Sequence, residues 1–264
     1  MDEASLRKLL SGLPVSQVRY FDSIGSTNDE ALAWASAGAP DFSLVYAEQQ
    51  TSGRGRMGRK WFTPPATALA LSLVLRPTER ERQHIGLFAG LAALALASTL
   101  EKYGIAAQIK WPNDVLIKGS KTAGILVEAV WMGGEPESVV MGIGVNVAPE
   151  SVPPVKMLSF PATCILSEAP SPIERFDLLR VLVGELVFWR SKLASDEFIH
   201  GWNDALAFRG ETVQVWEAKD GDIRGAAPTT GQLEGIETDG SLRLRLSNGK
   251  AQVVHFGEVH LRPL

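Results

Sequence analysis

The hydrophobic pattern of the first 150 residues predicts an alternation of buried strands and helices. The helical pattern at residues 85–103 is apolar on nearly all sides near its start, so we expect a helix buried on several faces. Continuous or alternating apolar runs predict strands at residues 42–47, 67–75, 114–118, 124–131 and 138–148. The last three runs should pair as a meander that forms the floor of the larger domain.

Residues 18–38 read as a strand, a turn and a helix. Thr27 followed by Glu30 predicts a capping box at the helix start, and Gly38 stands where the helix should end. The hydroxyl and amide groups of Ser26, Thr27 and Asn28 suit helix capping and suit the binding of a small polar ligand equally well.

The second half of the chain changes character twice. Six prolines between residues 149 and 172 predict a long loop, and loops of that length are usually functional or mobile. Helical spacing returns at residues 174–193 and 195–206, with Ser195 near the second start and with Trp189 and Trp202 as core residues.

Short alternating strands follow from about Arg209. They are expected at residues 211–216, 241–246 and 251–256, with Asp239-Gly240 and Asn248-Gly249 as hairpin turns. The expected fold is therefore α+β: a mixed sheet with flanking helices in residues 1–208, and a small SH3-like β-barrel in residues 209–264.

Composition narrows the function classes. Among 264 residues, 45% are hydrophobic and the net charge is -4, which is typical of a soluble protein and argues against an extended nucleic-acid surface. Cys164 is the single cysteine and the four histidines are scattered, so neither a disulfide nor a zinc site is expected. The N-terminus has no signal-peptide pattern, and the apolar run 85–97 is shorter than the roughly 18 residues of a membrane span. A cytoplasmic protein without a membrane span is expected.

The stretch TSGRGRMGRKW at residues 51–61 is the strongest candidate for chemistry. It places three glycines among four cations, and this combination lets backbone N–H groups and forked arginine donors approach an anion. Gly53, Gly55 and Gly58 also fit the dinucleotide-binding spacing, but Pro64 and Pro65 leave no room for the helix which that motif needs. A solvated basic turn is the plain alternative.

Lys110 is the second candidate. Strand alternation puts Ile109 and Trp111 on one face and Lys110 on the other, so the lysine points away from the face that they bury. It is either an edge-strand lysine that discourages aggregation or a cation that contacts a phosphate.

Four stretches in this order resemble the biotin protein ligases: GSTNDEA (25–31), AEQQTSGRGRMGRKWFTP (47–64), KWPNDVLIKGSKTAGILVE (110–128) and GIGVNV (142–147). The resemblance covers the chain after about residue 15. It implies the catalytic fold shared with class II aminoacyl-tRNA synthetases, followed by the small β domain. Position 57 departs from the family pattern, since it holds Met where a polar residue is frequent.

The resemblance also implies site residues. Ser26, Thr27, Asn28 and Gln50 would meet the ureido ring of biotin, Arg54, Gly55 and Arg56 would close over biotin and its adenylate, and Lys110 would touch the biotin carboxylate and an ATP phosphate. Lys110 and Arg56 are the catalytic candidates. The backbone of Gly124, Ile125 and Leu126 would border the biotin pocket, and Asn146 would lie near the adenosine.

The implied reaction joins biotin to ATP, with Mg²⁺ accompanying ATP and no metal assigned to protein side chains, and then modifies a lysine of a biotin carboxyl carrier protein. Fewer than 30 residues precede Ser26, so no DNA-binding domain is expected. A homodimer is left open. The rivals are a lipoate or octanoate ligase, a nucleotide-dependent oxidoreductase, and a biotin-sensing module without catalysis.

Overall fold

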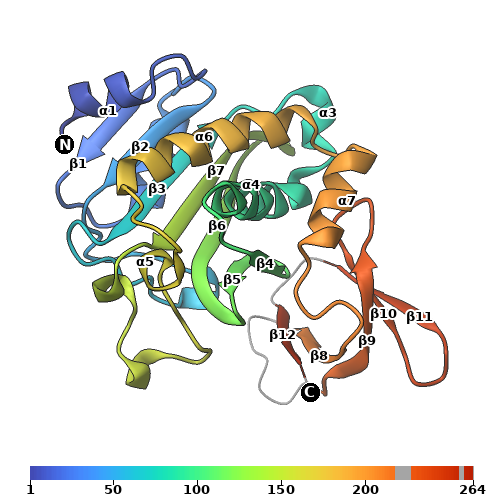
Figure 1. The fold of residues 1–264 in the computed structure, drawn as a ribbon. Coiled ribbons are helices and arrows are strands. Elements are labelled where there is room, and N and C mark those ends of the chain that lie inside the picture. Colours follow the sequence, from blue (N-terminus) through green and yellow to red (C-terminus); the bar gives the residue numbers. More distant parts are fainter. Residues whose placement is uncertain (218–226, 256–258, 264) are drawn as a thin grey trace.

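The computed structural model describes residues 1–217, 227–255 and 259–263. Its larger part is a seven-stranded sheet in the order β1-β2-β3-β7-β6-β5-β4 (Figure 1). β1 and β2 are parallel and the other neighbours are antiparallel, so the sheet is mixed and its meander β5–β6–β7 is as expected. The strands are β1 (Val18–Phe21), β2 (Ser43–Ala47), β3 (Ala68–Leu75), β4 (Ala107–Lys110), β5 (Asp114–Ile117), β6 (Ser120–Met132) and β7 (Glu135–Asn146).

Helices cover both faces of this sheet. The helices are α1 (Glu3–Leu9), α2 (Thr27–Ser36), α3 (Glu79–Arg82), α4 (Phe88–Lys102), α5 (Ile165–Glu168), α6 (Arg175–Ser191) and α7 (Asp196–Asp204). On one face α4 and α6 bury the main core (Figure 1). There Trp202 of α7 packs so closely on Gly90 of α4 that a Cβ at Gly90 would lie 2.2 Å from the indole. On the other face α2 buries a smaller cluster that includes Trp34 and Val140.

The start of α2 differs from the sequence prediction. Ser26 is its N-cap, and no side chain caps the first turn, so the predicted capping box of Thr27 and Glu30 is wrong. The reason is tertiary: the Thr27 hydroxyl bonds to Gln50 and the Glu30 carboxylate accepts from Arg19. Ser195, which the sequence places near the start of this helix, is the N-cap of α7, and its hydroxyl accepts from the Phe198 N–H.

The helical stretch Ile85–Lys102 is long and apolar enough to cross a membrane by length and composition alone. The expectation that this region is too short to span a membrane was therefore wrong, because the helical stretch reaches 18 residues. However, 67% of the stretch is buried within the protein, where α4 packs against the sheet and α6. Its apolar character is explained by its place in the core.

The C-terminal part is a five-stranded antiparallel sheet in the order β11-β10-β9-β8-β12. Its strands are β8 (Thr212–Glu217), β9 (Thr229–Ile236), β10 (Leu242–Arg245), β11 (Ala251–Val254) and β12 (Val259–Pro263). Gly240 and Gly249 have φ of 85° and 79°, as the predicted hairpin turns require. Phe256, the last residue of the predicted third strand, lies outside the described residues. Residues of β8, β9 and β10 join the main core, so the division at residue 209 stays a prediction.

Candidate active site

A cavity of about 290 Å³ opens on the face of the larger sheet that carries α2. Its floor follows the strand register, in which Lys110, Asp114, Gly124 and Gly144 are successive neighbours across four strands. The cavity is lined by every site residue that the resemblance implies: Ser26, Thr27, Asn28, Gln50, Arg54, Gly55, Arg56, Lys110, Gly124, Ile125, Leu126 and Asn146. The sequence prediction of one common site is consistent with this geometry.

Glycines make the floor flat. A Cβ at Gly144 would lie 2.4 Å from the indole of Trp61, and a Cβ at Gly142 would lie 2.0 Å from the Asn28 Oδ1. Real Cβ atoms do not approach so closely, so both side chains rest directly on the backbone of β7. The sequence therefore needs glycine here for close contact across the cavity floor.

One end of the cavity is lined by uncharged polar side chains that bond to one another. The Gln50 Oε1 accepts from the Thr27 N–H at 2.9 Å and lies 3.1 Å from the Thr27 hydroxyl, while its Nε2 donates to Thr63 at 3.2 Å. The Ser72 hydroxyl lies 2.6 Å from the Asn28 Oδ1. These groups stand at the N-terminus of α2, where the positive end of the helix dipole favours a ligand oxygen.

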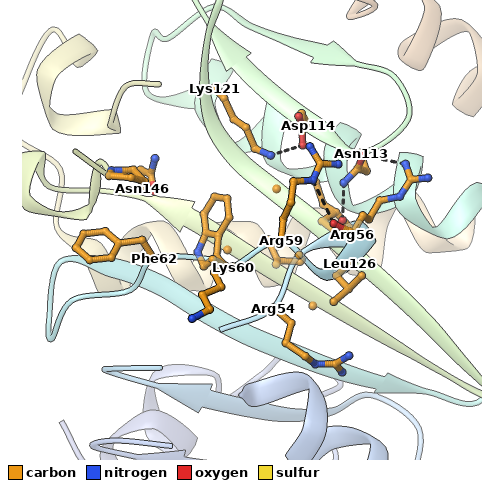
Figure 2. A pocket seen from close by; sticks show the side chains of 18 of the residues that line it. Arg54, Arg56, Arg59, Lys60, Phe62, Asn113, Asp114, Lys121, Leu126 and Asn146 are labelled. Atoms are coloured by element: carbon orange, nitrogen blue, oxygen red, sulfur yellow. Dashed lines mark hydrogen bonds and ion pairs between the residues drawn. The ribbon is translucent and has the colours of Figure 1, made fainter. Parts of the chain in front are cut away.

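The opposite end is cationic (Figure 2). The Lys110 Nζ lies 4.0 Å from the ring centre of Phe160, and the Lys121 Nζ is 2.6 Å from an Asp114 carboxylate oxygen. Arg56 donates to the Asn113 Oδ1 at 3.2 Å. The ammonium and guanidinium groups thus converge on one region, as binding of phosphate and carboxylate oxygens requires.

Arg54 points elsewhere. In Figure 2 it extends away from Arg56, Lys121 and Asp114. Its guanidinium pairs with both carboxylate oxygens of Glu128 at 3.0 and 2.7 Å, and lies 2.8 Å from Asp29. Partial burial alone would lower its pKa, but the bonds and charges of Glu128 and Asp29 outweigh burial and raise that pKa above its usual value. Arg54 is therefore neutralised at the polar end and does not join the cationic group in this structure.

Three other predicted residues contribute in specific ways. The Ile125 side chain is buried in the main core, and its backbone exchanges two hydrogen bonds with Asn113, at 2.9 and 2.8 Å. The Gly55 N–H donates to the Arg59 carbonyl at 2.7 Å and shapes the loop tip. The Asn146 amide donates to the Thr163 carbonyl at 3.1 Å, which ties β7 to the proline-rich segment.

The sequence reasoning missed several lining residues. Lys121 stood in the quoted stretch KWPNDVLIKGSKTAGILVE, between two predicted strands, but it lies near the start of β6, which also carries Gly124. Trp61 and Asn113 lay beside predicted residues and signalled nothing by themselves. Phe160 lies in the proline-rich segment, where no periodic pattern could place it against Lys110.

The comparisons with known proteins identify a family and a fold. Residues 20–146 match the biotin/lipoate A/B protein ligase family, and residues 217–262 match the biotin protein ligase C-terminal domain. The fold is similar to that of the Aquifex aeolicus biotin protein ligase solved with biotin and ATP (TM-score 0.79, 24% identity), covering 94% of this chain and 100% of that one.

Two curated relatives differ in how much of their length is matched. The bifunctional ligase/repressor BirA of Bacillus spizizenii is 43% identical over 133 residues, which are 50% of this chain and 41% of that protein. The chain thus spans less than half of that relative. The biotin--[acetyl-CoA-carboxylase] ligase of Mycobacterium tuberculosis is 35% identical over 280 residues, which cover 99% of this chain and 96% of that protein. On this near-complete match, the chain belongs to the biotin protein ligase family.

Proposed function

We propose that this enzyme activates biotin with ATP and transfers it to a lysine of a biotin carboxyl carrier protein. The observation that carries the proposal is the two-ended cavity, with a polar end at the start of α2 and a cationic end at Lys110, Lys121 and Arg56. Biotin has the same polarity, since its ureido ring is neutral and its carboxylate is anionic.

In the first step an oxygen of the biotin carboxylate attacks the α-phosphorus of ATP. A bond forms between that carboxylate oxygen and the α-phosphorus, and the bond from the α-phosphorus to the oxygen that bridges it to the β-phosphate breaks. The products are biotinyl-adenylate and pyrophosphate. Lys110 and Arg56 lie where they can offset the charge of two approaching anions and of the leaving pyrophosphate. The biotin carboxylate is itself the nucleophile, so this step needs cationic side chains and no protein nucleophile.

The magnesium ion expected with ATP is part of that substrate. Among the described residues that line the cavity, Asp114 is the one carboxylate, and the described residues contain no cluster of three metal-binding side chains. Asp114 already pairs with Lys121 at 2.6 Å, so most of the Mg²⁺ ligands would be phosphate oxygens of the substrate and water oxygens.

In the second step the amine of the carrier lysine attacks the acyl carbon of the adenylate. An amide bond forms, the acyl–phosphate bond breaks, AMP leaves, and the amine loses a proton. We infer that the enzyme acts in the cytoplasm, where the ATP that the proposed reaction consumes is found. The name of the Mycobacterium tuberculosis relative supports a carrier of acetyl-CoA carboxylase as the substrate class.

The test is exchange of labelled pyrophosphate into ATP, measured with biotin and separately with lipoate. We expect exchange with biotin and no exchange with lipoate. Exchange only with lipoate would identify a lipoate ligase, whereas biotin binding without any exchange would identify a sensing module and contradict the proposed reaction. Labelling of a carrier lysine, detected by mass spectrometry, tests the second step.

A further inference from the structure

Glu128 of β6 bonds both to Arg54 in the glycine-arginine loop and to Asn28 at the start of α2. Its Oε1 accepts from the Arg54 Nη1 at 3.0 Å and its Oε2 from the Arg54 Nη2 at 2.7 Å. The same Oε2 accepts from the Asn28 Nδ2 at 2.8 Å. Glu128 is absent from the residues that line the cavity, so its effect on a ligand must pass through Arg54 and Asn28.

The Glu128 carboxylate, together with the Leu126 carbonyl, sets which way the Asn28 amide faces. An ionised carboxylate only accepts hydrogen bonds, so the amide NH₂ must be directed at Glu128. Both donors of that NH₂ are then used, one by Glu128 and one by the Leu126 carbonyl at 3.2 Å. The Oδ1 accepts from Ser72 and keeps a second lone pair, and Asn28 lines the cavity. Asn28 therefore offers a ligand an acceptor and no donor.

The same carboxylate holds the glycine-arginine loop. Its bidentate pair with Arg54 is of the strong, geometrically defined kind. The Asp29 side chain is 59% exposed and that of Glu128 is 27% exposed, so the Glu128 pair is the less screened of the two. Arg54 thereby fixes the loop beside Asn28.

We propose that Glu128 is the positioning residue for ureido recognition: it turns the Asn28 carbonyl oxygen toward a ureido N–H and, through Arg54, holds the loop closed beside it. This inference rests on the proposed function, because the ureido ring belongs to biotin. It makes loop closure and recognition of the ureido end depend on one carboxylate.

Glu128→Gln tests the inference with almost no change in shape. We expect the Kd for biotin, measured by calorimetry without ATP, to rise by about tenfold to a hundredfold, the range for loss of a charged hydrogen bond. The KM for ATP in pyrophosphate exchange should stay unchanged, because the cationic end is untouched. Glu135→Gln is the matched control, since Glu135 lies on the neighbouring strand and pairs with Arg82 at 2.8 Å on the surface.

A second variant separates the two actions of Glu128. Arg54→Met removes the ion pair that holds the loop and leaves the hydrogen bond from Asn28 to Glu128 in place. We expect hydrogen-exchange protection of the loop amides to fall in Arg54→Met, while the biotin Kd rises less than in Glu128→Gln.

Each result has a defined meaning. A wild-type biotin Kd for Glu128→Gln, or equal losses of biotin and ATP affinity, would overturn the positioning role. A biotin Kd raised as much in Arg54→Met as in Glu128→Gln would overturn the role of Asn28 orientation. If the wild-type protein did not bind biotin at all, the proposed function would fail together with this inference.

Discussion

Lys110 lines the cavity, while the residues on either side of it in the chain are buried in the core. Ile109 and Trp111 are 0% and 1% exposed, while Lys110 lines the cavity on the opposite side of β4. Lys110→Ala should therefore fold normally, because it opens no core cavity. We expect pyrophosphate exchange to fall by at least about tenfold, given about 1.5 to 3 kcal/mol for one charged hydrogen bond. Exchange at the wild-type rate, in a variant with an unchanged melting temperature, would remove Lys110 from the mechanism.

The residues near Lys110 show what a sequence can and cannot predict. Period-two alternation placed Lys110 correctly because that rule is local to one strand. The partners of Lys121 and Arg54, which are Asp114 and Glu128, follow from strand register and loop path over distances that no local pattern encodes. Hence the lining residues were predictable by resemblance, whereas the pairing that neutralises Arg54 was not.

The loop that contains Arg56 is closed by a few specific contacts. Arg56 donates to Asn113 at 3.2 Å, and its carbonyl accepts from the Arg59 N–H and Nε. Arg56→Gly would remove the guanidinium anchor and add backbone freedom. We expect biotinyl-adenylate to leave about 10 to 100 times faster, if about 1.5 to 3 kcal/mol of closure is lost.

The released adenylate would acylate lysines of bystander proteins, because it is a reactive mixed anhydride. A streptavidin blot of serum albumin incubated with the variant, biotin and Mg-ATP measures this labelling. Pyrophosphate exchange must be assayed in parallel as the control for adenylate synthesis. Bystander labelling no greater than that of the wild type, in a variant that still exchanges, would show that Arg56 does not retain the intermediate.

The junction of α3 and α6 gives a pH prediction. The Arg190 Nε donates to Glu81 at 2.8 Å, and its Nη1 donates to both oxygens of Asp41 at 2.9 Å. Burial would raise the pKa of Glu81, but the bonds from Arg190 and Thr78 outweigh it and lower that pKa below its ordinary value of 4.5. The stabilisation is therefore complete above pH 4.5 and is lost as the pH falls through the lower pKa of the folded state.

Glu81→Gln should accordingly lower the free energy of unfolding by about 1.5 to 3 kcal/mol at neutral pH. The difference from wild type should shrink below pH 4.5, where the wild-type carboxylate also becomes neutral. Urea denaturation across this pH range measures the difference in free energy of unfolding, and Glu79→Gln, at an exposed position of the same helix, is the control. A difference that stayed constant down to the acid transition would mean that Glu81 acts by packing and not by charge.

At this scale the predicted elements were largely confirmed, and β9 shows why one strand was missed. The strands read in the larger domain are all present, including β1 and the strand that carries Lys110, whereas β9 and β12 were not predicted. β9 carries alternating burial, but two glycines and several polar residues dilute the hydrophobic pattern. Such strands are specified by their neighbours in the sheet more than by their own residues.

The whole molecule is held together by contacts between the C-terminal sheet and the larger part. The Trp111 Nε1 donates to the Gly240 carbonyl at 3.0 Å, and both sheets share the main core. Deleting residues 209–264 would therefore strip cover from Trp111, which lies beside Lys110. A point change that loosens the sheet without touching this strand is the sharper probe of its role.

Asn203 of α7 provides that probe. Its Oδ1 accepts from the Ile236 N–H at 2.8 Å, and its Nδ2 lies 3.3 Å from the Ile236 carbonyl, so one side chain pins β9 to the helix. Asn203→Ala should cost about 1 to 3 kcal/mol, because it leaves these backbone groups without their partner. Asn203→Asp is the matched control, since it keeps the acceptor for Ile236.

If the C-terminal sheet helps to receive the carrier protein, Asn203→Ala should slow carrier biotinylation more than biotin-dependent pyrophosphate exchange. The reason is that the residues proposed to bind biotin and ATP precede residue 150, while the loosened strand follows it. Hydrogen exchange in β9 must first confirm the loosening. Carrier biotinylation at the full rate in the loosened variant would then leave the sheet with a role in stability alone.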